Sequence, residues 1–407
     1  MPSKKIAFEN ETGHTLSAIL DVPTTPPVAY ALFAHCFTCS KNLKAATNIA
    51  RALNAAGIAV LRFDFTGLGQ SEGDFADTNF SSNISDLLAA VDYMGRELGS
   101  PSILIGHSLG GTAVLAAASM VDSAVAVATI GSPSEPAHVA RMFSGSEDAL
   151  RERGEATVNL GGRPFLMKQQ FLDDLDKQDL RTSIHSLRKA LLILHAPLDT
   201  IVEIDNASAL FMAAKHPKSF VSLDNADHLL SREADSTYAG DVLAAWASRY
   251  LPARSSDGPY DGEGPAHDAQ VIARTERGEF RTEVQIGEHS LIADEPRSVG
   301  GTGLGPTPYD LLSAALATCT SMTLKMYAEH KKLALESATV VVDHDKLHAK
   351  DCEDCESTDG KIDEFRRSIL LEGELSDEQR QRMLEIADRC PVHRSLHGEI
   401  KVRSKLA

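Results

Sequence analysis

The chain has 407 residues, of which 43% are hydrophobic and 24% are charged, and its formal net charge is −17. This length exceeds what one hydrophobic core usually supports, so we expect two or three domains of ordinary globular composition. The charge would repel a phosphate backbone and no basic stripe offsets it, so we expect no nucleic-acid partner. No apolar run is long enough for a membrane span and the N-terminus has no signal-peptide core, so we expect a cytoplasmic protein.

The first 250 residues alternate short β-like runs with helical patterns. This alternation predicts an α/β domain with a doubly wound, mostly parallel sheet, whose central strands are apolar because helices cover both faces. The strands are expected at residues 16–22, 28–35, 58–65, 102–108, 124–131, 189–196 and 220–225, and the helices at 42–57, 83–98 and 110–121.

The motif Gly-His-Ser-Leu-Gly, residues 106–110, lies between a predicted strand and a predicted helix. In a G-x-S-x-G pattern the flanking glycines permit a strained turn, which lifts the hydroxyl of Ser108 out of the sheet. The backbone amide of Leu109 can then donate a hydrogen bond to an oxyanion. The motif therefore predicts a serine nucleophile, and the alternative is a tight turn without chemistry.

Two residues that could complete a catalytic triad follow in the chain order expected for this fold. Asp199 comes just after the predicted strand 189–196, and His228 follows the strand 220–225. Both lie at C-terminal strand ends, where open α/β sheets hold their sites. We predict that Ser108 attacks the substrate, that His228 takes and returns its proton, and that Asp199 orients the imidazole.

Residues 1–250 resemble an α/β-hydrolase of the serine-aminopeptidase or esterase type. The segment FDFTGLGQSEG, residues 63–73, is similar to the loop after that family's fourth strand, and LLILHAPLDTIV, residues 191–202, is similar to its acid strand. The resemblance implies an α/β hydrolase fold in this half. It also leaves residues 134–188 between the sixth strand and the acid strand, where we expect a small cap.

The loop HCFTCSKN, residues 35–42, departs from the family's usual His-Gly pair. By position, the resemblance implies that the amide of Phe37 completes the oxyanion hole, with Cys36 in place of the glycine. Cys36 and Cys39 form a C-x-x-C pair, which is a redox pair, half of a metal site or simply two small side chains. His35 and the histidine of the serine motif are expected to shape the site rather than react.

A linker is expected at residues 251–267, which are rich in Pro, Gly, Asp and Ser and have no apolar periodicity. The remaining residues, 268–407, change to an α+β pattern and are expected to form a separate domain. Long strands are expected at 279–294 and 338–348, and helices at 308–331 and 376–389.

Cys319 lies in the predicted helix 308–331, and Cys390 follows a helix and precedes a proline. The chain has six cysteines, too few for a disulfide scaffold, so catalytic, metal-binding or core thiols are expected. The segments GGTGLGPTPYDLLSAALATCTSMTLKMYA and CPVHRSL closely resemble the OsmC and organic-hydroperoxide-resistance family. The resemblance implies that Cys319 is the peroxidatic thiolate, that Cys390 resolves it, and that the domain forms a homodimer.

This resemblance has one departure. The family places a glutamate ten residues before the peroxidatic cysteine, where it steadies an arginine that lowers the thiol's pKa; here that position holds Tyr309, followed by Asp310. Without a nearby cation, Cys319 would react slowly at neutral pH. The arginines that precede the helix, and are candidates for this role, are Arg274, Arg277, Arg281 and Arg297.

An acidic insertion, HDKLHAKDCEDCESTDGKIDEF, carries histidines and cysteines in an H-x-x-x-C-x-x-C spacing. A zinc ion would tolerate this spacing, but the fourth ligand is missing, so we favour a solvated acidic loop. We predict no metal and no other cofactor. The candidates if a metal is bound are His348, Cys352 and Cys355.

The leading hypothesis is a bifunctional enzyme. A serine hydrolase of ester, thioester or amide bonds is fused to a cysteine-based organic hydroperoxide reductase. Its small-molecule partners would be an acyl substrate, an organic hydroperoxide and a dithiol reductant. The alternative is that only the hydrolase is active and that the OsmC-like domain serves dimerisation or ligand binding.

Overall fold

The computed structural model describes most of the chain and divides it into two compact units, residues 1–266 and 267–407. The described residues are 3–23, 26–36, 40–135, 150, 152–160, 163–175, 177–251, 271–275, 280–287, 289–348 and 360–406. The predicted linker, 251–267, lies almost entirely outside these ranges. Each unit is therefore described by itself.

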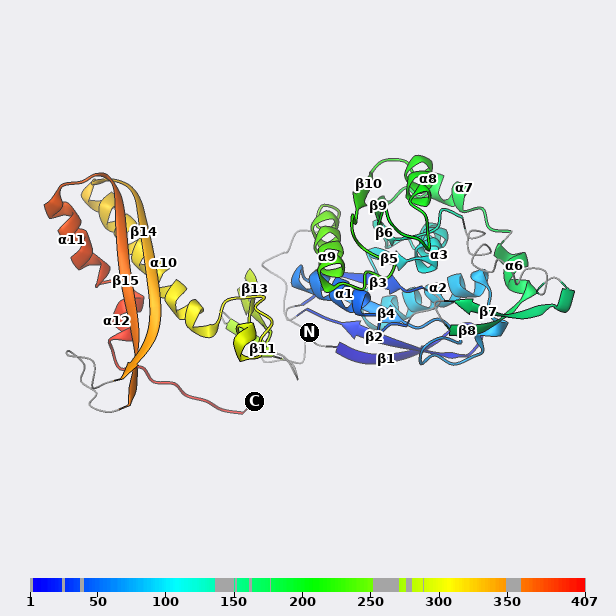
Figure 1. The fold of residues 1–407 in the computed structure, drawn as a ribbon, viewed down its shortest axis with the longest axis horizontal. Helices are drawn as coiled ribbons and strands as arrows, with labels where there is room; N and C mark the ends of the chain where they lie inside the picture. The colour runs from blue at the N-terminus through cyan, green and yellow to red at the C-terminus, as the bar shows by residue number, and fades with distance from the viewer. Residues whose placement is uncertain are drawn as a thin grey trace. The chain divides into compact units, whose positions relative to one another are not determined.

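The first unit is built on an eight-stranded sheet with the strand order β1-β2-β4-β3-β5-β6-β9-β10 (Figure 1). Every neighbouring pair from β4 to β10 is parallel, whereas β1 and β2 add an antiparallel edge. This confirms the predicted doubly wound, mostly parallel sheet. The strands are β1 (Ser3–Glu9), β2 (Thr15–Asp21), β3 (Ala29–Ala34), β4 (Ile58–Phe63), β5 (Ile103–His107), β6 (Ala126–Ile130), β9 (Ala190–His195) and β10 (Lys218–Ser222).

Both faces of this sheet are buried. Along β3, Leu32 packs in one hydrophobic cluster and its neighbour Phe33 in the other, because successive side chains point to opposite faces. Helices α1 (Lys44–Ala55) and α9 (Glu233–Ala247) contribute to the cluster that holds Phe33. The cluster that holds Leu32 is covered by α2 (Phe80–Glu97), α3 (Leu109–Ala117), α7 (Leu180–His185) and α8 (Asp205–Ala213).

The segment expected to form a cap contains a small separate sheet in its described part. It is the antiparallel hairpin of β7 (Glu155–Leu160) and β8 (Arg163–Lys168), followed by α6 (Gln169–Leu175). The hairpin packs beside the short helix η1 (Phe75–Asp77), and α6 packs on α2. Whether this segment limits substrate size stays a prediction.

The second unit has two antiparallel sheets and three helices in its described part (Figure 1). One sheet holds β11 (Val271–Thr275), β12 (Thr282–Ile286) and β13 (His289–Ala293); the other pairs the long strands β14 (Ala334–His348) and β15 (Lys361–Glu374). The helices are α10 (Pro308–Lys331), α11 (Asp377–Ala387) and α12 (Pro391–Leu396). The prediction of a single strand at 279–294 was wrong, because Gly287, at φ +56°, separates β12 from β13.

Helix α10 begins where its sequence dictates. The Thr307 side chain accepts from the Asp310 amide while the Asp310 carboxylate accepts from the Thr307 amide, and Pro308 fills the first helical position. The helix packs on β14 and on α11 around a small core of Leu324, Ala328, Met383, Ile386 and Ala387. In the part of the chain that the structure describes, no helix combines the length and apolar character that crossing a membrane requires.

Candidate functional site

Ser108 lies at a sharp turn between β5 and α3, with φ 55° and ψ −126°. This left-handed conformation is strained for a residue with a side chain. Two close approaches require glycine beside it: a Cβ on Gly106 would lie 2.3 Å from the Gly110 carbonyl oxygen, and one on Gly110 would lie 2.3 Å from the Ala34 carbonyl oxygen. The serine motif thus forms the strand-to-helix turn that it predicts.

Asp199 and His228, which are 29 residues apart in sequence, are in direct contact: Asp199 Oδ2 lies 2.7 Å from His228 Nδ1. The other carboxylate oxygen accepts from the amides of Ile201 and Val202, at 2.8 and 2.9 Å. Burial raises the pKa of Asp199, but the hydrogen bonds from His228 and from these amides outweigh it, so the pKa falls below its usual value. The carboxylate therefore stays ionised and holds Nδ1 of the His228 imidazole by a hydrogen bond.

His107, which belongs to the serine motif, contacts the same residue, His228. Its Nε2 lies 2.7 Å from the His228 carbonyl oxygen, so Nε2–H donates, and the two rings are 5.1 Å apart. Burial lowers the pKa of His107 to about 3, helped by the neighbouring charge of His228. His107 is therefore neutral at neutral pH, and its contact with the His228 backbone fits the expectation that it shapes the site, which stays a prediction.

The expected oxyanion donors are only partly described. Leu109 is the first residue of α3, and first-turn amides have no acceptor within their own helix. Phe37 and Cys39 lie outside the described residues, so the second donor stays a prediction. Cys36 is buried and disulfide-bonded, and the ring of His35 lies against its carbonyl, with Nδ1 2.6 Å from the oxygen.

The second unit brings its two predicted cysteines together although they are 71 residues apart. The Cys390 sulfur caps α12 by accepting from the His393 amide at 3.3 Å, and the Cys319 sulfur accepts from the Val392 amide at 3.5 Å. The Thr320 hydroxyl lies 3.5 Å from the Cys390 sulfur. Both cysteines are free thiols.

Arg367, in β15, is a cation that lies beside Cys390. Its Nη1 donates to the Thr320 hydroxyl at 3.0 Å and to the Ala387 carbonyl at 3.1 Å, beside Cys390. Burial raises the pKa of Cys390, but the bonds from Thr320, the His393 amide and Cys319, together with the charge of Arg367, bring it below its usual value. A charged residue at an inward position of a strand, between the apolar neighbours Phe365 and Ile369, was the available signal.

Which of the four arginines that precede α10, if any, activates Cys319 stays a prediction. Arg277 lies outside the described residues, and Arg297 donates to the Thr302 carbonyl at 3.2 Å. Arg274 lies in β11, and Arg281 lies 4.0 Å from Glu283. Arg367, which is not one of those four, bonds Thr320, and the Thr320 hydroxyl in turn lies beside the Cys390 sulfur.

Tyr309 makes contacts that a carboxylate could not make. Its ring stacks on His344 with centroids 4.2 Å apart, and the Lys346 ammonium lies 4.9 Å from the ring centre. His344 in turn bonds Asp363 at 2.9 Å. Among the described residues no group of three or more His, Cys, Asp or Glu side chains could hold a metal; Cys352, Cys355 and the side chain of His348 lie outside them.

The two halves match two protein families. Residues 31–240 match the alpha/beta hydrolase family, and residues 301–405 match the family of OsmC-like proteins. The esterase domain of a Rhodothermus marinus protein is 54% identical, with a TM-score of 0.54, over 62% of this chain and 100% of that domain. Est1E from Butyrivibrio proteoclasticus, solved with ferulic acid bound, is 21% identical with a TM-score of 0.52, over 60% of this chain and 98% of its own, which supports the fold alone.

Two further relatives match by sequence. The mitochondrial palmitoyl-protein thioesterase ABHD10 of Rattus norvegicus is 31% identical over 113 residues, which are 26% of this chain and 37% of the rat protein. The chain thus spans little more than a third of that relative's length. The uncharacterized protein YfhR of Salmonella typhimurium is 25% identical over 215 residues, which are 51% of this chain and 68% of YfhR.

Proposed function

Because the chain belongs to the alpha/beta hydrolase family and continues into an OsmC-like domain, we propose that it is a bifunctional enzyme. The first domain is a serine hydrolase that uses Ser108, His228 and Asp199. The second reduces organic hydroperoxides with Cys319 and Cys390. The two activities use different nucleophiles and can be tested separately.

The hydrogen bond between Asp199 and His228 is the observation that carries the hydrolase proposal. Because Nδ1 of His228 is held by the carboxylate, Nε2 is left to take the proton of Ser108. The serine oxygen then attacks the acyl carbon, and the oxyanion is stabilised by the amides of Leu109 and Phe37. His228 returns the proton to the leaving group, and a water molecule, activated by the same histidine, releases the acid.

The substrate class follows from the relatives rather than from the site. The Rhodothermus marinus domain is an esterase, and the rat relative is a palmitoyl-protein thioesterase. We therefore propose acyl esters or thioesters as substrates, ahead of amides. The choice between the two stays open to measurement.

An acyl-chain series tests the hydrolase proposal. Nitrophenyl esters and matched thioesters of increasing chain length should be cleaved by the wild type and not by Ser108→Ala. A fluorophosphonate probe should label the wild type and spare the variant. Equal labelling of the two proteins would show that Ser108 is not the nucleophile and that the proposed triad is wrong.

The peroxidase proposal rests on the convergence of both sulfurs on the first turn of α12. The Cys319 thiolate attacks the hydroperoxide O–O bond, becomes a sulfenic acid and releases an alkoxide that is protonated to the alcohol. The Cys390 sulfur then attacks the sulfenic sulfur and forms a disulfide with Cys319. The displaced hydroxide takes up a proton and leaves as water. An external dithiol reduces that disulfide to the two thiols.

Consumption of cumene hydroperoxide in the presence of a dithiol tests this cycle. The wild type should consume it, and Cys319→Ser should not. Cys390→Ser should stop after one turnover with a sulfenic acid that a dimedone probe captures. If wild type and Cys319→Ser consume peroxide equally slowly, only the hydrolase is active, and the second domain serves dimerisation or ligand binding.

A homodimer through the second domain is part of the same proposal. Helix α10 buries only Leu316, Thr320, Leu324 and Ala328. Another face of the helix is apolar yet exposed, at Leu312, Met322 and Met326. Cys319 lies on this face, since Leu312, Cys319 and Met326 follow one another at a heptad spacing and Met322 comes three residues after Cys319. A second copy packed on this face would shield the peroxidatic thiol from water, which suits an apolar hydroperoxide.

A further inference from the structure

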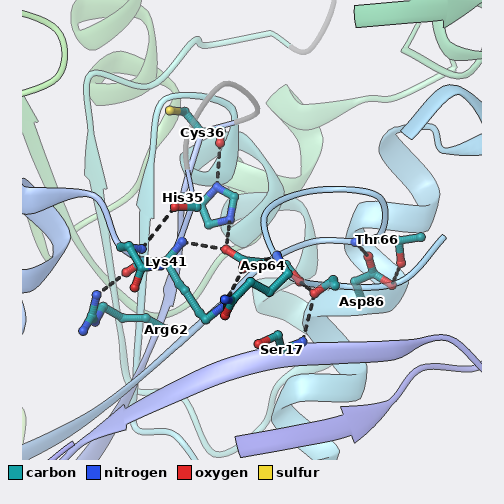
Figure 2. Close-up of polar contacts among 12 residues, drawn as sticks. Ser17, His35, Cys36, Lys41, Arg62, Asp64, Thr66 and Asp86 are labelled. Carbon is teal, nitrogen blue, oxygen red and sulfur yellow. Dashed lines mark hydrogen bonds and ion pairs between the residues drawn. The ribbon is translucent and has the colours of Figure 1, made fainter. Parts of the chain in front are cut away.

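The loop between β3 and α1, which carries the expected oxyanion donor, is held at its C-terminal end by a buried carboxylate. Asp64, directly after β4, is fully buried, and Lys41 is 2% exposed. The Lys41 amide donates to Asp64 Oδ1 at 2.6 Å, and its ammonium lies 2.5 Å from Oδ2 (Figure 2). Arg62, paired with Asp21, donates to the Lys41 carbonyl, so backbone and side chain are both fixed at this residue.

The same carboxylate reaches the N-terminal end of the loop. His35, 1% exposed, places Nε2 3.4 Å from Asp64 Oδ1 and Nδ1 2.6 Å from the Cys36 carbonyl oxygen, as Figure 2 shows. A ring with one proton donates through only one nitrogen, so the contact of Nε2 with Asp64 is an ion pair that forms when the ring carries both protons. The Cys36 carbonyl and the next amide in the chain belong to one planar peptide unit. A hydrogen bond to the Cys36 carbonyl therefore anchors the described N-terminal end of the loop, just before the expected oxyanion donor.

Burial makes these contacts costly to break. Two charges removed from water stabilise a protein only if they are paired and their remaining hydrogen-bonding positions are satisfied. Asp64 meets this condition, since it also accepts from the Gln70 amide at 2.9 Å. Burial raises the pKa of Asp64, but the bonds from His35 and Lys41 outweigh it and hold the pKa well below its usual value. The carboxylate is therefore ionised at any pH at which the hydrolase would work.

We propose that Asp64 is a positioning residue for hydrolysis, which holds both ends of the oxyanion loop through His35 and Lys41. This inference rests on the proposed serine hydrolase and adds to it a residue that touches neither the substrate nor Ser108. An oxyanion donor acts in the transition state and must be oriented before the reaction. Loosening the loop therefore lowers kcat more than it raises KM.

Asp64→Asn is the test variant, because asparagine keeps the shape and removes the charge. Deleting one oxyanion donor costs about 10²–10³-fold in kcat, so a loosened donor should cost about 10–100-fold. KM should change less than about threefold, because ground-state binding does not use the oxyanion donors. Ser108→Ala sets the background rate.

Asp86→Asn is the matched control. Asp86 is also buried and accepts from the Thr66 amide at 2.8 Å and from Asn10 at 2.8 Å, so it ties down the segment next to Asp64. These contacts do not involve residues 35, 36 or 41. Asp86→Asn should leave kcat within about twofold of the wild type, since the transition state gains nothing from it.

Hydrogen exchange gives a second readout that does not depend on activity. Peptides covering residues 35–43 should exchange faster in Asp64→Asn than in wild type or in Asp86→Asn. If Asp64→Asn does not fold, Asp64→Asn/Lys41→Met removes both buried charges and is measured in its place.

The outcomes separate this inference from the function on which it rests. Faster exchange with a selective loss of kcat supports it. Unchanged exchange, or faster exchange with unchanged kcat, overturns it. If the wild type shows no Ser108-dependent hydrolysis, the proposed function fails, and the exchange data still decide whether Asp64 holds the loop.

Discussion

The two units support their candidate sites in different ways. The serine site sits on a sheet whose two faces carry large hydrophobic clusters, and Asp199, His107 and Asp64 are all buried and bonded. The thiol site sits on α10 and α12, beside a cluster of only five fully buried hydrophobic residues among those described. A single chain thus preorganises the first site, whereas the second leaves an apolar face of α10 open.

This difference concerns electrostatics as well as packing. In a buried site, each hydrogen bond acts in a low dielectric. Replacing one carboxylate by an isosteric amide therefore strongly weakens its interaction with its partner. In the thiol site Arg367 divides its bonds among Thr320, Ala387 and the exposed Asp388. We therefore expect substitutions to have large effects in the first unit and moderate effects in the second.

Asp199→Asn should give the largest effect. The asparagine cannot stabilise the imidazolium that forms when His228 takes the serine proton, so kcat should fall by about 10³–10⁴-fold. Ester hydrolysis by wild type and variant measures this. Peroxide consumption should be unchanged in the same preparation, and Asp205→Asn, at the exposed start of α8, should match the wild type in both assays. A parallel loss of both activities would show that the two sites are not separate.

Met326→Glu should weaken the proposed dimer, because it places a charge on the exposed apolar face of α10. Placing a charge on a face that packs against another copy leaves it buried without a partner, so the dimer should weaken by at least about tenfold. Light scattering across a concentration series measures this. Lys325→Glu, at the preceding position, where the side chain is 73% exposed and pairs with Glu329, makes a larger change of charge beside that face and should leave the mass unchanged. A wild type that is monomeric at all concentrations contradicts the dimer.

The sequence predicts the strands of the first unit well where their side chains are buried on both faces of the sheet, and poorly where they are exposed. The strands with both faces covered, β3, β4, β5, β6 and β9, are mostly apolar runs and were predictable. The pairing of Asp199 with His228 was predictable as well. The edge strand β1 was not, because only Phe8 of its residues is buried and it has no apolar pattern. The contacts of Asp64 with Lys41 were also beyond reach, since they depend on β3 and β4 lying side by side in the sheet.

The thiol site shows the same limit. The cysteine pair was predictable from its two segments, but the arginine was sought before α10, whereas Arg367 comes from β15, after it. Its proximity to Cys390 depends on the pairing of β15 with β14 and on how α10 packs against β14. Periodicity alone cannot supply that packing, because it shows which face a residue lies on but not what covers that face.

Arg367→Ala should raise the pKa of Cys390, because it removes the nearby positive charge. Ultraviolet thiolate absorbance against pH, referenced to Cys390→Ser, measures the direction of this shift. Arg366→Ala is the matched control, since Arg366 points to the other face and pairs with Glu364 at 3.0 Å. Equal titration curves for the two variants would remove Arg367 from the proposed site.

The effect of His107 should be confined to acid stability. Its pKa is about 3 in the folded protein, against an ordinary value of 6.5, so below pH 6.5 the unfolded chain binds a proton that the folded protein excludes. The free energy of unfolding therefore falls as the pH drops from 6.5 towards 3, by up to about 1.4 kcal/mol per pH unit from this group.

His107→Asn removes this titration and should flatten the fall between pH 6.5 and 4, as measured by urea unfolding at several pH values. Buried His195 has a lowered pKa for the same reason, so part of the fall remains in the variant. The exposed His185→Asn should follow the wild-type curve. Because the carboxylates with lowered pKa values, Asp64 and Asp199, titrate below this window, a variant curve parallel to the wild type would mean that His107 is not held neutral beside His228.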